Sequence, residues 1–160
     1  MSSMSPEQLR AIESVCASGV EEVVEARRPN DLVTLRAALR EDANVSPSLR
    51  QNAIHILGRW GDAESGPAIR SLLPTFDERE RINAVDALGR LGGPEAEAAV
   101  LQMTEDESPD VRRFAAYALS NLGTETAQAR LRGMEETDPV QWVRAAAARS
   151  RSREEGPLSP

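Results

Sequence analysis

Four arginines recur at one position of a repeated sequence, and they are the first candidates for a functional site. They are Arg50, Arg81, Arg112 and Arg144. Asp106 and Asp138 stand six residues before the last two. A row of guanidinium groups can bind an anion, because arginine forms paired hydrogen bonds with carboxylates and phosphates. The same row can be an internal ladder, in which each arginine bonds to a loop residue or carbonyl of its own or a neighbouring repeat. We expect the ladder, because stacked repeats place equivalent residues at equivalent positions.

The single cysteine, Cys16, and the single histidine, His55, limit the chemistry of the chain. They exclude a disulfide framework and any metal site that needs several thiolates or imidazoles. We expect Cys16 to be a packed small hydrophobe rather than a nucleophile. His55 shares its repeat position with Asp86, Tyr117 and Arg149, and a position that accepts all four types faces solvent. We expect it on a convex surface, and we expect no catalytic residue, metal or cofactor.

The repeat that positions these residues has a period of 31. Residues 49–61, 80–92 and 111–123 carry one pattern, and a fourth copy begins at Val143. Such a period is typical of stacked units that cannot bury their apolar faces alone. Each unit reads as two helices, with serine or aspartate as N-cap of the first and glycine at its end. The expected caps are Ser46, Asp77 and Ser108, and the expected terminating glycines are Gly61, Gly92 and Gly123.

The fold class is therefore all-α, an α-solenoid of about four to five stacked antiparallel helix pairs. We expect atypical capping helices over 1–45, repeats over 46–76, 77–107 and 108–137, a partial repeat over 138–149, and a disordered tail over 150–160. Asn30 is the expected N-cap of a helix that ends near Arg40. Whether the helix that precedes it is broken at Ser18-Gly19 stays open.

The composition narrows the class of partner. The 160 residues carry a formal net charge of −7, and all 19 basic residues are arginine. A net negative charge argues against nucleic acid, whose binding depends on neutralised phosphates. No run of 18 apolar residues is present, so we expect no membrane insertion. With no visible secretory signal in the first residues, we expect a cytoplasmic protein.

The stretch from Val111 to Gly123, Val-Arg-x-x-Ala-Ala-x-Ala-Leu-x-x-Leu-Gly, resembles the HEAT repeat. It is most similar to the short HEAT-like class first described in phycobilisome lyases. The spacing from Asp106 to Arg112, and from Asp138 to Arg144, is also similar to that family. The resemblance covers about residues 46–149, and it implies that the second helix of each pair lines a concave face.

A column on these second helices is the candidate partner site. Its members are Arg36, Arg70, Leu101 and Arg132, with Ser71 and Gln102 beside them. Arg36 and Arg70 have no carboxylate three or four residues away, whereas Arg132 has Glu135 and Glu136 at that spacing. Small residues flank the column, so we expect a groove that takes a helix or an extended acidic segment.

These observations favour a non-catalytic protein–protein interaction module, an adaptor or scaffold, that binds a partner protein or peptide on its concave face. A phycobilin-lyase-like or other enzyme-accessory role is the alternative, since the same repeat carries scaffolds, enzyme subunits and lyases. The iron chemistry of the HEAT-like deoxyhypusine hydroxylases is excluded, because it uses several His-Glu pairs. The net charge disfavours the HEAT-like DNA glycosylases. The partner and the oligomeric state stay open.

Overall fold

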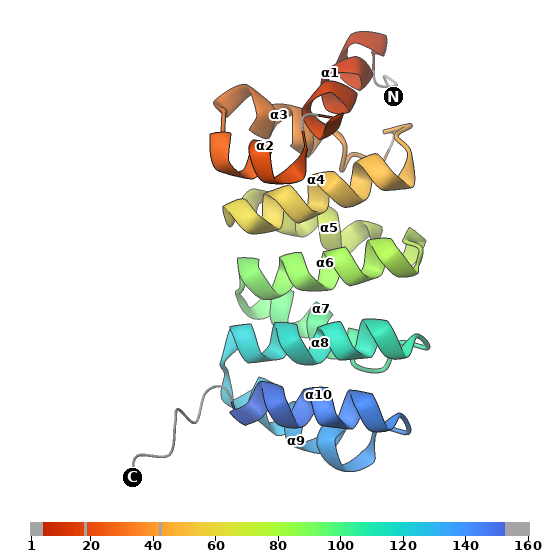
Figure 1. The fold of residues 1–160 in the computed structure, drawn as a ribbon, viewed down its shortest axis with the longest axis vertical. Coiled ribbons are helices and arrows are strands. Elements are labelled where there is room, and N and C mark those ends of the chain that lie inside the picture. The colour runs from red at the N-terminus through yellow and green to blue at the C-terminus, as the bar shows by residue number, and fades with distance from the viewer. Residues whose placement is uncertain (1–4, 18, 42, 153–160) are drawn as a thin grey trace.

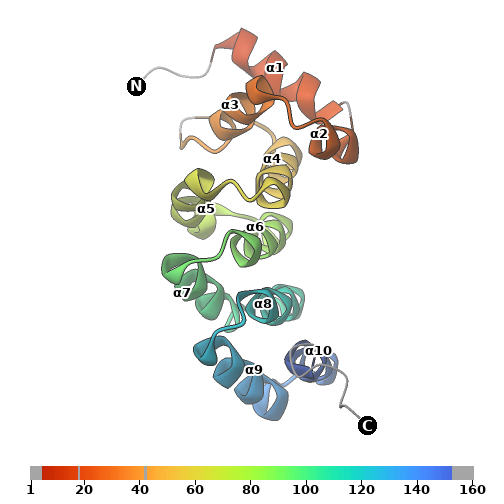
Figure 2. The same ribbon diagram turned by 90° about the vertical axis from the view of Figure 1, so that its left-hand side faces the viewer.

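A computed structural model describes residues 5–17, 19–41 and 43–152 of the chain. Within these ranges it contains ten α-helices, two short 3-10 helices and no strand. The helices stack in two layers along one curved line (Figures 1 and 2). The all-α solenoid of paired helices that the period of 31 predicts is confirmed.

The helices follow one another in pairs after an N-terminal group of three. The N-terminal group is α1 (Pro6–Ala17), α2 (Val20–Ala26) and α3 (Pro29–Ala37). The front layer of Figure 1 is α4 (Pro47–Trp60), α6 (Glu78–Leu91), α8 (Pro109–Leu122) and α10 (Gln141–Ser152). The layer behind is α5 (Gly66–Leu72), α7 (Pro94–Met103) and α9 (Glu125–Thr137), with η1 (Ala63–Ser65) and η2 (Leu73–Thr75) on either side of α5.

The predicted caps begin the long helices of the front layer. The Ser46 hydroxyl accepts a hydrogen bond from the Leu49 amide at 3.3 Å. Ser108 does the same for the third unit at 3.4 Å. Asp77 and Glu80 form a reciprocal capping box, in which each side chain accepts from the other residue's amide. These bonds satisfy amide groups that have no partner within the helix.

Glycine ends these helices as predicted, with one difference. Gly61 and Gly123 are left-handed, with φ of 66° and 63°. Gly92 also has a positive φ of 71°, but its ψ of −169° lies outside the left-handed helical region. That backbone region is accessible essentially to glycine alone.

The stack curves toward α4, α6, α8 and α10, which lie on the inside of the arc in Figure 2. These four helices pack along one another's length, whereas α5, α7 and α9 contact each other only slightly. Close approach of the inner helices depends on glycine. A Cβ on Gly58 would lie 2.7 Å from the Ala87 Cβ, and one on Gly89 would lie 2.6 Å from the Ala118 Cβ. Our expectation that the second helices of each pair line the concave face is therefore wrong, because the tightly packed first helices do.

The three N-terminal helices cover the end of the stack above α4. The Trp60 indole donates to the Val24 carbonyl at 3.0 Å, and Arg27 donates to the Trp60 carbonyl at 2.9 Å. The helix expected to begin after Asn30 starts at Pro29 instead, which suits the first turn because proline has no amide to satisfy. The preceding helical stretch is interrupted, with α1 ending at Ala17 and α2 beginning at Val20, while Ser18 itself lies outside the described residues.

The last helix is longer than the sequence pattern indicates. Helix α10 continues to Ser152, so residues 150–152, which we expected in a disordered tail, are helical. Ser150 is buried, and its carbonyl accepts a hydrogen bond from the Ser120 hydroxyl at 2.9 Å. The rest of the expected tail, 153–160, lies outside the described residues. In the described part of the chain, every helix is too short or too polar to cross a lipid bilayer.

Candidate functional site

The four arginines of the repeat form ion pairs and hydrogen bonds inside the stack. The first three each reach a carboxylate at the start of the next front-layer helix or in the loop before it. The pairs are Arg50 Nη1 with Glu80 Oε1 at 3.1 Å, Arg81 Nε with Asp106 Oδ2 at 2.9 Å, and Arg112 Nε with Asp138 Oδ2 at 2.8 Å. The sequence singles out the two aspartates but not Glu80. The capping box could have indicated Glu80, because a capping-box glutamate places its carboxylate at the start of a helix, beside the preceding repeat.

The same arginines also hold the loop that precedes their own helix. The carbonyls that accept are Ala43 for Arg50 at 3.4 Å, Phe76 for Arg81 at 3.2 Å, Asp106 for Arg112 at 2.9 Å, and Asp138 for Arg144 at 2.7 Å. Each of the first three therefore ties the loop before its own helix to a carboxylate beside the next front-layer helix. Their donors point into the stack, and this geometry leaves no row of arginines for a bound anion.

The pair of Arg112 and Asp138 is the most enclosed step of this ladder. Both side chains are buried, and a second bond joins Arg112 Nη2 to Asp138 Oδ1 at 3.2 Å. Burial disfavours the charged form of Asp138. The hydrogen bonds from Arg112 and from the Val140 amide outweigh that effect, so the pKa of Asp138 lies below its ordinary value. The carboxylate therefore remains ionised at neutral pH.

The predicted partner column lies on the outer layer, not on the concave side. At its first position, Arg36 is held by carboxylates of the next unit rather than left free. Its Nε donates to Asp62 Oδ2 at 2.9 Å, a second nitrogen bonds to the other Asp62 oxygen, and Nη1 donates to Glu64 Oε2 at 2.6 Å. Arg36 is thus a link between units, and its place in a partner site stays a prediction.

At the last position of the column, Arg132 lacks the helical ion pair that we expected. Glu135, the expected helical partner of Arg132, pairs with Arg151 Nε at 3.0 Å. Arg132 is exposed and has no ion pair among the described residues. Leu101 is half-buried and packs against the core, and the Ser71 hydroxyl donates to the Ala68 carbonyl on its own helix.

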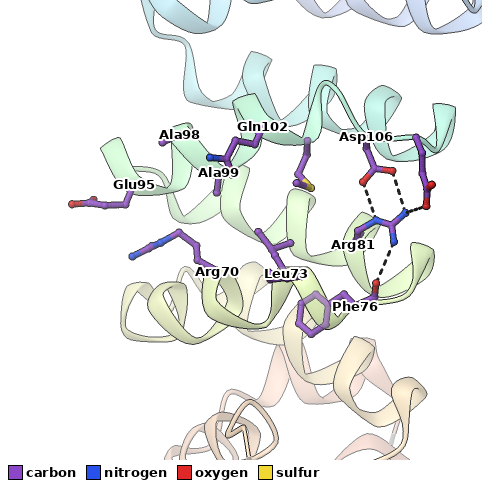
Figure 3. Close-up of a pocket in the computed structure, with 12 residues that line it drawn as sticks. Arg70, Leu73, Phe76, Arg81, Glu95, Ala98, Ala99, Gln102 and Asp106 are labelled. Atoms are coloured by element: carbon purple, nitrogen blue, oxygen red, sulfur yellow. Dashed lines mark hydrogen bonds and ion pairs between the residues drawn. The ribbon is translucent and has the colours of Figure 1, made fainter.

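Two members of the column meet at one cavity. Arg70 of α5 and Gln102 of α7 both line a pocket of about 660 Å³ on the outer face. Figure 3 shows Arg70 and Gln102 on the same side of this pocket, with Leu73 and Phe76 below it. Arg132, Leu101 and Ser71 do not line it. The structure therefore divides the predicted column rather than gathering it.

The concave face is formed by positions that we expected on the convex side. Helix α6 packs against α4, α8 and α7, so its remaining exposed stripe faces the inside of the curve. Equivalent stripes run along the other three inner helices. Their central residues are His55, Asp86, Tyr117 and Arg149.

An aromatic cluster lies on this inner face, at the end formed by α8 and α10. Phe114 and Tyr117 pack edge to face, with ring centroids 5.9 Å apart. The Arg113 guanidinium lies 5.2 Å from the Phe114 ring centroid and 5.3 Å from that of Trp142. Trp142 is 43% exposed, and Phe114 and Tyr117 are half-buried. Of the five aromatic residues in the chain, these three share one surface, and the other two are buried.

The inner helices also differ in charge from the rest of the chain. Together α4, α6, α8 and α10 carry ten arginines and four carboxylates, a formal charge of +6. The whole chain has a formal charge of −7. The remaining segments are therefore strongly acidic, and the layer formed by the four inner helices is basic although the chain as a whole is acidic.

His55 lies within this inner surface as a half-buried residue, not a fully solvated one. Burial lowers its pKa below the ordinary value of 6.5, and the nearby Asp86 carboxylate only partly opposes that shift. His55 is therefore neutral at pH 7. The side chain of Cys16 lies outside the described part of the structure.

Comparison with known families agrees with the repeat geometry. The model for HEAT repeats matches residues 32–95 and 72–151, which together span most of the chain. The chain belongs to the HEAT repeat family. A search of curated proteins found no match to it.

The HEAT match places the described units in one continuous array. It begins within α3 and ends within α10, so at least part of the N-terminal group belongs to the repeats. HEAT repeats generally mediate protein interactions. Among the described residues, no group of three or more His, Cys, Asp or Glu side chains is placed to hold a metal ion.

Proposed function

We propose that this HEAT repeat protein is a non-catalytic interaction module that binds an acidic segment of a partner protein on its inner face. The observation that carries the proposal is the cluster of Trp142, Phe114 and Tyr117 around Arg113 on that face. Exposed aromatic side chains and arginine are the residue types enriched at binding hot spots. Trp142 is 43% exposed beside two further rings, and an exposed apolar patch of this kind marks an interaction site.

Charge supports an acidic partner rather than a basic one. Within the inner stripe, Arg59 pairs with Glu21, Arg90 with Asp86, and Arg113 with Asp110. Among the described residues of the stripe, Arg79 and Arg149 are exposed and have no ion pair. A carboxylate of the partner can pair with either one without displacing an internal contact.

A protein partner fits this face better than nucleic acid does. Affinity for nucleic acid grows with the number of phosphates that cations neutralise. Most arginines of the inner helices are already committed to carboxylates or carbonyls of this chain, which leaves few for a phosphate backbone. A groove for single-stranded nucleic acid has aromatic side chains along its length, on which successive bases stack. Here the aromatic cluster is confined to one end of the face.

Capture from a lysate of the source cells tests the proposal. The double variant Arg79→Glu with Arg149→Glu reverses two exposed charges and touches no internal contact. We expect it to lose the captured partner at moderate salt and to melt as the unmodified chain does. The control is Arg132→Glu, an equally unpaired arginine on the outer face, which should retain the partner. Equal capture by both variants, or binding of DNA in place of protein, would refute the proposal.

A further inference from the structure

The outer face holds an apolar pocket that belongs to neither the arginine ladder nor the inner surface. It opens between η2 and α7 and has a volume of about 660 Å³, within the range of ligand sites. Its apolar lining includes Leu73, Phe76, Ala99 and Met103. Figure 3 shows Arg70 and Gln102 toward one end of the pocket and Arg81 with Asp106 toward the other, with Leu73 between them.

The equivalent gap one repeat later is narrower: the pocket there has a volume of about 300 Å³ and is partly filled by a polar bridge. There Arg130 of α9 donates to the Thr104 hydroxyl at 2.6 Å and to the Glu105 carboxylate at 3.1 Å. Displacement by 31 residues brings Ala99, Leu73 and Pro74 to these three positions. All three members of the bridge are thus replaced together, an arginine by alanine and its two partners by apolar residues. This joint replacement accounts for the larger pocket at this level of the stack.

Of the two arginines that line the pocket, one is already paired within the chain and the other is available to bind a ligand. Arg81 is occupied by Asp106, by Glu107 at 3.5 Å and by the Phe76 carbonyl. Arg70 is half-buried and, within the described residues, has no ion pair or hydrogen-bonded acceptor. Its guanidinium lies beside Gly66, where a Cβ would come within 3.3 Å of Nη1. An unpaired, partly desolvated guanidinium at the edge of an apolar cavity can bind a carboxylate bidentately.

We propose that this pocket binds a short peptide segment in which a large apolar side chain adjoins a carboxylate. The apolar side chain would enter between Leu73, Phe76 and Met103. The carboxylate would pair with Arg70, and the Gln102 amide would donate to the peptide backbone. The site is separate from the inner face, so the protein would engage two segments on opposite sides of the stack.

An array of heptapeptides tests this inference directly. Each probe has leucine, phenylalanine or serine at its centre and either aspartate or lysine on both sides. We expect the acidic probes with an apolar centre to bind at least about tenfold more tightly than the other classes, the scale of one charge-assisted contact. In protein labelled with ¹³C on the methionine methyl groups, the signal of Met103 should shift and that of Met134, buried on α9 outside the pocket, should not.

Matched variants from the repeat locate the site. Arg70→Gln should remove the preference for acidic probes, whereas Arg132→Gln, two repeats later and outside the pocket, should preserve it. The inference is overturned if leucine- and serine-centred probes bind alike, if Arg70→Gln leaves the selectivity unchanged, or if the Met103 methyl signal does not move. Because these readouts involve no residue of the inner face, their failure would leave the proposed function standing.

Discussion

Gly89 in α6 lies directly against Ala118 in α8, with no room for a methyl group between them. A Cβ on Gly89 would lie 2.6 Å from the Ala118 Cβ and 2.8 Å from its Cα. Gly58 has the same relation to Ala87 one repeat earlier. These contacts bring the inner helices together while the outer helices spread, and the direction of the curve follows from that difference.

Gly89→Ala should therefore destabilise the protein, although alanine is the better helix former by about 1 kcal/mol. Overpacking at such a contact costs about 1–3 kcal/mol, and the Ala118 backbone cannot yield as a flexible side chain would. We expect a net loss of about 1–2 kcal/mol in the free energy of unfolding, measured by urea denaturation. The control is Gly133→Ala in α9, where nothing lies within 4 Å of the new methyl group, and it should stabilise the protein. A stabilised Gly89→Ala variant would contradict the packing.

The period of 31 predicts the helices, their caps and the arginine ladder, because each depends on neighbouring residues or on repetition. The direction of curvature is not contained in the period, since a unit can be divided before either of its two helices. The glycines in the interior of the inner helices were the available signal: Gly58 and Gly89 mark where two backbones approach closely. The partner of Arg36 was missed for another reason. Asp62 belongs to the next unit and is 26 residues away, so the spacing within a helix does not show it.

Arg112→Ala should lower the free energy of unfolding by about 1–3 kcal/mol. The change leaves the buried Asp138 carboxylate with the Val140 amide in place of three donors, and it removes the Arg112 hydrogen bonds to two loop carbonyls. Arg79→Ala, which removes an exposed arginine with no ion pair among the described residues, should stay within about 0.5 kcal/mol of the unmodified chain. Chemical denaturation of the two variants measures the difference. Equal midpoints would mean that the ladder contributes nothing to stability.

The Asp138 carboxylate should make stability depend on acid. Its pKa is lower in the folded than in the unfolded chain, so the unfolded chain binds the proton first as the pH falls. The stabilisation is complete above the ordinary aspartate pKa of 3.8 and is lost as the pH falls through the folded value. In Asp138→Asn, the free energy of unfolding should fall less steeply below pH 5 than in the unmodified chain. Identical slopes would argue against the lowered pKa.

His55 should titrate below 6.5, because burial disfavours its imidazolium form. As the chain has one histidine, its imidazole proton signals in an NMR titration need no assignment. Since the folded pKa is the lower one, stability should be greatest above 6.5 and should fall as the pH drops through the folded value. His55→Gln should remove that part of the pH dependence. A measured pKa at or above 6.5 would show that the Asp86 carboxylate outweighs burial.

Photo-crosslinking at Tyr117 tests the central claim, that the inner face is the partner site. p-Benzoylphenylalanine replaces Tyr117 in one protein and Ala129, on the outer layer and outside the pocket, in another. On irradiation in a lysate of the source cells, we predict one discrete protein adduct from position 117, lost in the background of Arg79→Glu with Arg149→Glu, and none from position 129. An adduct from position 129 alone, or one from position 117 that survives both charge reversals, would contradict the account.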